Sequence, residues 1–141
     1  MRKDNIKGVV CLIKQKPLQY PFNALEPYYS EETLIIHYEV LYKGYVDNLN
    51  KIEEKLKLMR DKMNYEDIKC VEKNLSFYGS GVILHELFFE NMSPPILSQP
   101  NIVLIRQMDK DFGGYKNFKK QFVEAAKAVE ASRLVSISMG T

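Results

Sequence analysis

The chain has 141 residues, which is enough for one domain or for two small layers that share a core. Hydrophobic residues make up 45% and charged residues 27% of the sequence, values typical of a soluble globular protein. The net charge is +2 with both signs mixed along the chain, and no apolar stretch approaches the length of a membrane span, so we expect neither a nucleic-acid nor a membrane partner.

The first 29 residues are predicted to form an irregular arm, because Pro17, Pro21 and Pro27 interrupt any helix there. Ser30 is a good N-cap residue and begins a predicted helix that runs to about residue 63. Gly44, inside this helix, is expected to mark a kink or a close helix contact. The positions expected to form one face recur at helical spacing: Leu34, His37, Leu41, Tyr45, Asn48, Leu49, Ile52, Leu56 and Met59.

A second helix is predicted from about residue 66 to residue 91, where Pro94 and Pro95 prevent its continuation. Gly79 and Gly81 either interrupt this helix or permit close packing. Two long helices joined by a short turn are typical of an antiparallel hairpin.

The sequence after the hairpin predicts shorter elements. A linker at residues 94–100 precedes a helix near residues 102–112, which Gly113 and Gly114 stop, and a further helix covers about residues 115–130. Residues 133–138 are typical of a single strand, whose backbone groups need a partner from elsewhere. The predicted domains are the arm at 1–29, the hairpin at 30–93 and a C-terminal domain at 101–141.

The two cysteines, Cys11 and Cys70, lie far apart and form no CxxC motif. A disulfide framework is therefore not expected, and reduced thiols indicate a cytoplasmic location. The N-terminal apolar run ends at Lys14 without a cleavage signature, so it does not predict a signal peptide.

His37 and His85 are the only histidines, and the hairpin is expected to bring them face to face. Histidine is the commonest metal ligand among side chains. A histidine on an apolar helical face, taken alone, is more often a hydrogen-bonded core residue, so both interpretations stay open at this point. Tyr45 lies two turns after His37 on the same predicted face, where its hydroxyl could reach a solvent molecule on a metal.

Several segments resemble the iron/manganese superoxide dismutases, in order along the chain. They are residues 18–27 (LQYPFNALEP), 30–37 (SEETLIIH), 45–50 (YVDNLN), 79–94 (GSGVILHELFFENMSP) and 109–130 (DKDFGGYKNFKKQFVEAAKAVE). The resemblance covers about residues 18–132. It implies a mostly α chain from an α+β family, with an N-terminal antiparallel α-hairpin followed by the helical start of a truncated α/β domain.

The resemblance also implies roles for particular residues. His37 and His85 fall on the family's first two metal ligands, and the metal is manganese or iron. Tyr45 falls on the family's tyrosine that gates the substrate superoxide and joins the hydrogen bonds of the metal-bound solvent. Gly81 is small, as in manganese-type members, where iron-type members often have glutamine. The family tends to pair, which makes a homodimer one candidate assembly, although the sequence does not give the oligomeric state.

The sequence departs from the family where the remaining ligands belong. The family takes two further ligands from an Asp-x-Trp-x-x-His motif, but this sequence has no third histidine and no tryptophan. Leu41 and Val82 stand where members often carry histidine, and Phe89 stands where tryptophan is usual. Shifted by one base, codons for the Arg-Leu-Val that starts at Arg133 can encode the family's Gly-Trp, so we hypothesise a frameshift there.

The expected activity is the disproportionation of superoxide to dioxygen and hydrogen peroxide, impaired in this truncated chain because two of four ligands are absent. A site with only two histidine ligands leaves most coordination positions to water, which gives little control over the redox potential of a metal. One alternative is a catalytically silent superoxide dismutase-like remnant or interaction module. Another is an unstable fragment that exposes Phe118 and Phe122 and associates with other chains.

Overall fold

The computed structural model describes residues 12–95 and 100–129, which form helices and no strand. They belong to two compact units that divide near residue 96. The mostly α fold class is confirmed for these residues, while the predicted strand at 133–138 lies outside them. In chain order the elements are α1 (Glu31–Ile35), η1 (Ile36–Tyr42), α2 (Lys43–Lys62), α3 (Ile68–Glu90), α4 (Ile102–Phe112) and α5 (Tyr115–Lys127).

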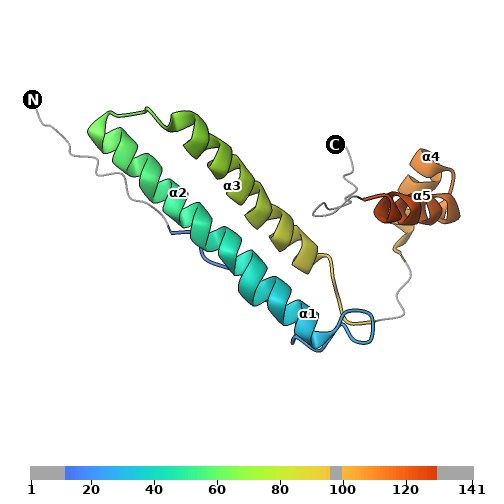
Figure 1. Cartoon of the computed structure of the whole chain (residues 1–141). Coiled ribbons are helices and arrows are strands. Elements are labelled where there is room, and N and C mark those ends of the chain that lie inside the picture. The colour runs from blue at the N-terminus through green and yellow to red at the C-terminus, as the bar shows by residue number, and fades with distance from the viewer. Residues whose placement is uncertain (1–11, 96–99, 130–141) are drawn as a thin grey trace, which may run out of the picture. The chain divides into compact units, whose positions relative to one another are not determined.

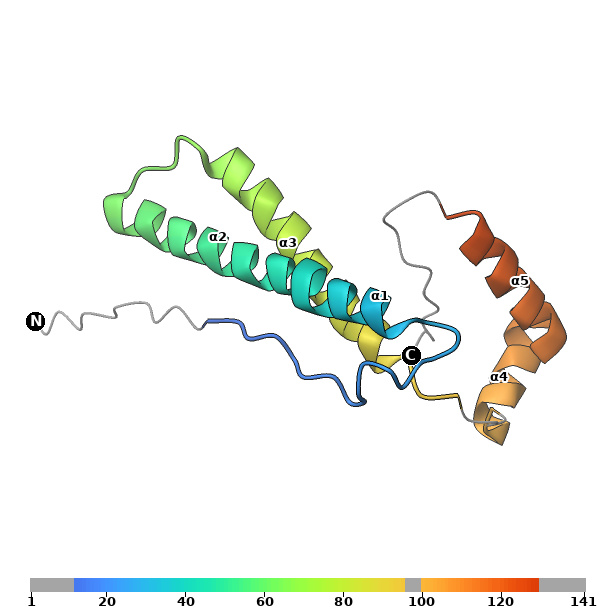
Figure 2. The ribbon, with the colours of Figure 1, turned by 60° about the horizontal axis from the view of Figure 1, so that its bottom comes forward.

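The first long helix consists of α1, η1 and α2, which follow one another without a break (Figure 1). It begins at Ser30, whose hydroxyl oxygen accepts a hydrogen bond from the backbone N–H of Thr33 at 3.2 Å, as expected of an N-cap. It ends at Met63, which adopts a left-handed conformation with φ 50°. The chain then turns, and α3 runs back antiparallel to α2 (Figures 1 and 2), so the predicted hairpin is confirmed.

The expected core face of this helix is wrong at Leu41, because η1 is a π-helix. Leu41 is 51% exposed, whereas Tyr42, the next residue, is fully buried. A π-helical turn holds one residue more than an α-helical turn, so the positions that follow it are rotated by about 100° relative to a regular α-helix. Tyr42 and Val46 therefore continue the buried face that starts at Leu34.

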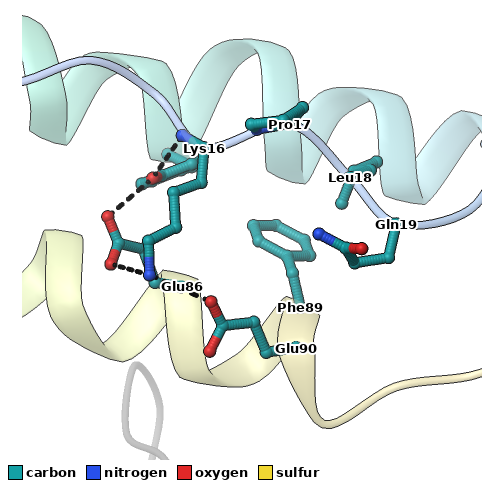
Figure 3. A pocket seen from close by; sticks show the side chains of 8 residues that line it. Lys16, Pro17, Leu18, Gln19, Glu86, Phe89 and Glu90 are labelled. Atoms are coloured by element: carbon teal, nitrogen blue, oxygen red, sulfur yellow. Dashed lines mark hydrogen bonds and ion pairs between the residues drawn. The ribbon is translucent and has the colours of Figure 1, made fainter.

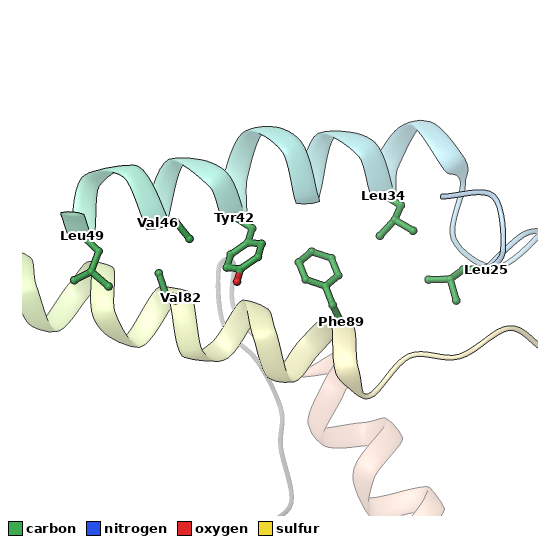
Figure 4. Packing of buried hydrophobic residues seen from close by; sticks show 7 residues of the cluster. All are labelled: Leu25, Leu34, Tyr42, Val46, Leu49, Val82 and Phe89. Carbon is green, nitrogen blue, oxygen red and sulfur yellow. The ribbon is translucent and has the colours of Figure 1, made fainter. Parts of the chain in front are cut away.

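The main hydrophobic core lies between the two long helices and the arm. Figure 4 shows the buried side chains from α1, η1 and α2 pointing toward those of α3. A second, smaller cluster of Leu56, Met59 and Val71 lies nearer the turn. The seven residues of the main core are Leu25, Leu34, Tyr42, Val46, Leu49, Val82 and Phe89.

The two glycine predictions have different outcomes. At Gly44 an added Cβ would meet no atom within 4 Å, so this position is not a close helix contact. Helix α3 continues through Gly79 and Gly81 without interruption. A Cβ at Gly81 would overlap the ring of Tyr45, so Gly81 is the position that permits close packing of the two helices.

The described part of the arm, residues 12–29, contains no helix or strand and lies along the hairpin (Figure 2). The side chain of Asn50 forms two hydrogen bonds with the backbone of Ile13, one to its N–H and one to its carbonyl, each 2.9 Å long. The hydroxyl of Tyr20 donates to the carbonyl of Phe89 at 3.0 Å. These bonds join the arm to both long helices.

The second unit contains α4 and α5. Asn101 caps α4 by accepting a hydrogen bond from the N–H of Leu104 at 2.8 Å. Helix α4 ends at Gly113, whose φ of 68° suits glycine, so the predicted stop is confirmed. Met108 is buried, and Phe118 packs edge-on against Phe112. Across all the described residues, every helix is too short or too polar to cross a membrane.

Candidate metal centre

The hairpin brings His37 of η1 and His85 of α3 into contact. Their ring centroids are 5.1 Å apart and their planes are nearly perpendicular, at 82°. Two imidazoles that bind one metal at about 2.0–2.1 Å from each nitrogen have ring centroids roughly 5 Å apart. The separation of the two rings therefore suits a shared metal ion.

In both imidazole rings the hydrogen bonds engage Nδ1 and leave Nε2 available. Nδ1 of His85 lies 2.6 Å from the carbonyl oxygen of Gly81, and because a carbonyl only accepts, Nδ1 must donate. Nδ1 of His37 lies 2.8 Å from the hydroxyl of Tyr29 and can also donate to it. In those tautomers each ring carries its lone pair on Nε2, the form that binds a metal.

Burial favours the neutral form of His37. Its half-buried position lowers the pKa of the imidazole, and the positive charge that His85 can carry lowers it further. A lowered pKa keeps the lone pair available at neutral pH, as metal binding requires.

Tyr45 lies against His85 rather than against His37. The centroids of the Tyr45 and His85 rings are 4.9 Å apart, and the tyrosine ring occupies the space that Gly81 leaves by having no Cβ. The predicted site residues His37, His85 and Tyr45 therefore lie in one cluster, at the level of the π-helical turn.

Several aromatic residues surround the two imidazoles, and the sequence predicted no site role for them. Phe88 and Phe89 lie 4.9 Å and 5.2 Å from the His37 ring, centroid to centroid. Tyr42 stacks on His85 with its plane only 10° from that of the imidazole. Tyr29 and Tyr42 carry no recognisable sequence signal, because one lies in the arm and the other is turned inward only by the π-helical turn.

The described residues supply two nitrogen donors and no more. Nowhere in 12–95 or 100–129 do three or more His, Cys, Asp or Glu side chains gather where they could hold a metal ion. Imidazole nitrogens suit iron, and manganese accepts them together with carboxylates. The pair formed by His37 and His85 thus fits part of an iron or manganese site.

Comparison with known proteins identifies the family. Residues 14–93 match the model of the α-hairpin domain of the iron/manganese superoxide dismutases. The chain belongs to the iron/manganese superoxide dismutase family. The matched range contains the whole hairpin with His37, Tyr45 and His85, so the resemblance seen in the sequence is confirmed.

Curated relatives of this superoxide dismutase family align with most of the chain. A probable iron superoxide dismutase of Bacillus subtilis is 41% identical over 113 residues, 80% of this chain and 40% of that protein. The iron superoxide dismutase of Methanothermobacter marburgensis is 43% identical over 117 residues, 82% of this chain and 58% of that protein. Manganese superoxide dismutase 2 of Haloferax volcanii is 38% identical over 112 residues, 79% of this chain and 56% of that protein. The chain thus matches about half the length of these relatives.

Proposed function

We propose that this chain provides the histidine half of a superoxide dismutase metal centre, in which His37 and His85 bind iron or manganese through Nε2. The observation that carries the proposal is the contact between the two rings, 5.1 Å apart, with both Nδ1 atoms already engaged. Two histidines that only packed in the core would not need both Nε2 atoms to be left without a hydrogen bond.

The substrate that we propose is superoxide. The bound metal supplies the redox chemistry, in which one superoxide is oxidised to dioxygen and a second is reduced, with two protons, to hydrogen peroxide. The chain's own residues hold both imidazoles by hydrogen bonds at Nδ1, exclude water with Phe88 and Phe89, and place the Tyr45 ring beside His85. Tyr45 is the residue that we expect to control the approach of the substrate.

We expect the activity of the 141-residue chain to be impaired. Its sequence has only two histidines, and its described residues bring no third ligand to them. Coordination positions left to water weaken metal binding and leave the redox potential poorly controlled. A second copy of the chain is one source of further donors, and a metal-dependent doubling of the mass in sedimentation experiments would support a homodimer.

We also propose a cytoplasmic location. Within residues 12–95 and 100–129, Cys70 is an exposed free thiol, which is typical of a reducing compartment. Fractionation of cells that express the chain tests this location.

The decisive experiment measures bound metal separately from activity. The full chain, His37→Ala and His85→Ala are equilibrated with manganese or iron, and the metal per chain is determined by mass spectrometry. Each substitution is expected to abolish binding, whereas Glu72→Gln, on the exposed surface of α3, is the control and should bind as the unsubstituted chain does.

The same preparations separate the alternatives. Bound metal without dismutase activity supports an impaired enzyme, whereas bound metal with full activity contradicts the impairment. A helical protein that binds no metal contradicts the proposed centre and supports the catalytically silent module.

A further inference from the structure

Tyr42, the buried tyrosine of the π-helical turn, contacts both His85 and the next residue of α3, Glu86. Its ring is parallel to the His85 imidazole within 10°, with centroids 5.8 Å apart, an offset stacking distance that aromatic rings favour. Its hydroxyl donates a hydrogen bond to Oε1 of Glu86 at 3.1 Å. Burial raises the pKa of Tyr42, so its hydroxyl keeps the proton that it donates.

Glu86 is in turn held by the arm. Its other oxygen, Oε2, lies 3.0 Å from Nζ of Lys16, and the same ammonium lies 3.0 Å from Glu90. The backbone N–H of Lys16 also donates to the Tyr42 hydroxyl at 3.1 Å. Figure 3 shows Lys16 beside Glu86 and Glu90 at a small pocket that residues of the arm, η1 and α3 line.

Because the charged groups are exposed, we expect them mainly to orient neighbouring side chains and to add little to the stability of the fold. The side chain of Lys16 is 55% exposed, and ion pairs at such positions contribute little to folding because solvent screens them. Tyr42, in contrast, is fully buried and has one acceptor for its proton, Glu86. Loss of that acceptor would leave a buried hydroxyl proton unpaired, which favours a shifted placement of the ring and of the imidazole stacked on it.

We propose that Tyr42 and Glu86 are positioning residues for His85: Glu86, held by Lys16, fixes the Tyr42 hydroxyl and thereby the ring face on which the imidazole lies. The inference rests on the proposed function, because it assigns the two residues to a metal-binding histidine. Residues that orient a ligand in this way typically change metal affinity by about 10–100-fold when they are replaced.

The chain offers a matched pair of substitutions for the test. Glu86→Ala removes an ion pair with Lys16 and the acceptor of the Tyr42 hydroxyl, whereas Glu90→Ala removes only an ion pair with the same lysine. Tyr42→Phe removes the hydroxyl and keeps the ring. Each variant is made in the full chain, and Mn²⁺ binding is measured by titration while circular dichroism checks the helical content.

We expect Glu86→Ala and Tyr42→Phe to weaken Mn²⁺ binding by about tenfold or more with unchanged helical content, and Glu90→Ala to stay within about twofold. Equal effects of Glu86→Ala and Glu90→Ala, or unchanged binding by Tyr42→Phe, would overturn the proposal. Lys16→Arg should preserve binding and Lys16→Met should weaken it, since only arginine keeps the positive charge.

A second measurement does not depend on metal. The ring nitrogen and proton signals of His85, followed by nuclear magnetic resonance in metal-free protein, are expected to shift or broaden in Glu86→Ala and Tyr42→Phe but not in Glu90→Ala. Unchanged signals in all three variants would overturn the positioning role. If the unsubstituted chain binds no Mn²⁺, the proposed metal centre fails, while these signals still decide the positioning claim.

Discussion

The hairpin unit and the α4–α5 pair are both built from amphipathic helices, but among the described residues only those of the hairpin enclose an extended core. Ten buried hydrophobic residues lie in the described part of the hairpin unit, whereas Met108 is the only one among residues 100–129. Two long helices with an arm across them can exclude water from the residues between them. Two short helices joined by a tight turn cannot, and Ile102, Val103 and Phe122 remain exposed in that part.

The difference teaches that helical periodicity alone does not make a core. The candidate site also lies in the well-packed region. Tyr42 and Phe89 belong to the hydrophobic core of the hairpin and also contact His85 and His37. Substitutions in the core of the hairpin should therefore affect stability and site together, and four predictions examine this contrast.

The largest effect is expected from Leu34→Ala. Leu34 is fully buried in the main core, and truncation of a buried leucine to alanine costs about 2–5 kcal/mol of unfolding free energy. Leu41→Ala, at the exposed position one residue before Tyr42, should change it by less than about 0.5 kcal/mol. Urea unfolding followed by circular dichroism measures both, and a larger loss for Leu41→Ala would show that the π-helical register is wrong.

A smaller effect is expected from Gly81→Ala. The added methyl group would overlap the Tyr45 ring, and overpacking of this kind costs about 1–3 kcal/mol. Gly44→Ala is the matched control, because it meets no neighbour and should stabilise the same hairpin by roughly 0.5–1 kcal/mol. Thermal melting shows whether each substitution raises or lowers the melting temperature. A higher melting temperature for Gly81→Ala would contradict the close contact with Tyr45.

The two helix caps compare the two regions directly. Ser30→Ala and Asn101→Ala each remove one side-chain acceptor from a helix N-terminus, at a cost of about 1 kcal/mol. In the hairpin this loss is small compared with the stabilisation that the buried hydrophobic residues provide, so α1 should remain helical. In α4 it should visibly reduce helical content, measured residue by residue from Cα chemical shifts. Ser30→Asp and Asn101→Asp keep a cap and serve as controls; equal fraying of α1 and α4 would remove the contrast.

The smallest effect concerns pH. The folded state holds the pKa of His37 below its ordinary value of 6.5, first through burial and then through His85. The unfolded chain therefore binds the proton more readily, so this contribution to stability is present above pH 6.5 and is lost as the pH falls through the folded pKa. Melting of the hairpin should shift downward between about pH 7 and pH 5, and His37→Gln should flatten the shift. An equal slope in His37→Gln would assign the effect to another group.

Much of the fold follows from local signals. Ser30 supplies an N-cap oxygen, Gly113 tolerates a left-handed conformation, and Pro94 cannot continue a helix, so each boundary depends on one residue and its neighbours. The juxtaposition of His37 and His85 also follows, because an antiparallel hairpin necessarily brings equivalent levels of its two helices together.

The error at Leu41 has a physical origin. Periodicity assumes a constant rotation per residue, and nothing in the sequence of η1 announces the extra residue in its turn. The π-helical turn places the large Tyr42 ring in the core, where it packs on Tyr38 and Phe89 and bonds to Glu86. Phe89 and Glu86 belong to α3, far from Tyr42 in the sequence, so the local pattern could not identify them.

The sequence by itself determined the family, the hairpin and the two histidines that we propose as ligands, because caps, prolines, glycines and short motifs act over a few residues. Only the tertiary structure decided which face of the first helix is buried, that Tyr45 lies beside His85, and that Tyr29 and Glu86 reach the histidine cluster. These features depend on packing and hydrogen bonds between residues far apart in the chain, and such interactions exist only once the arm and both helices are in place.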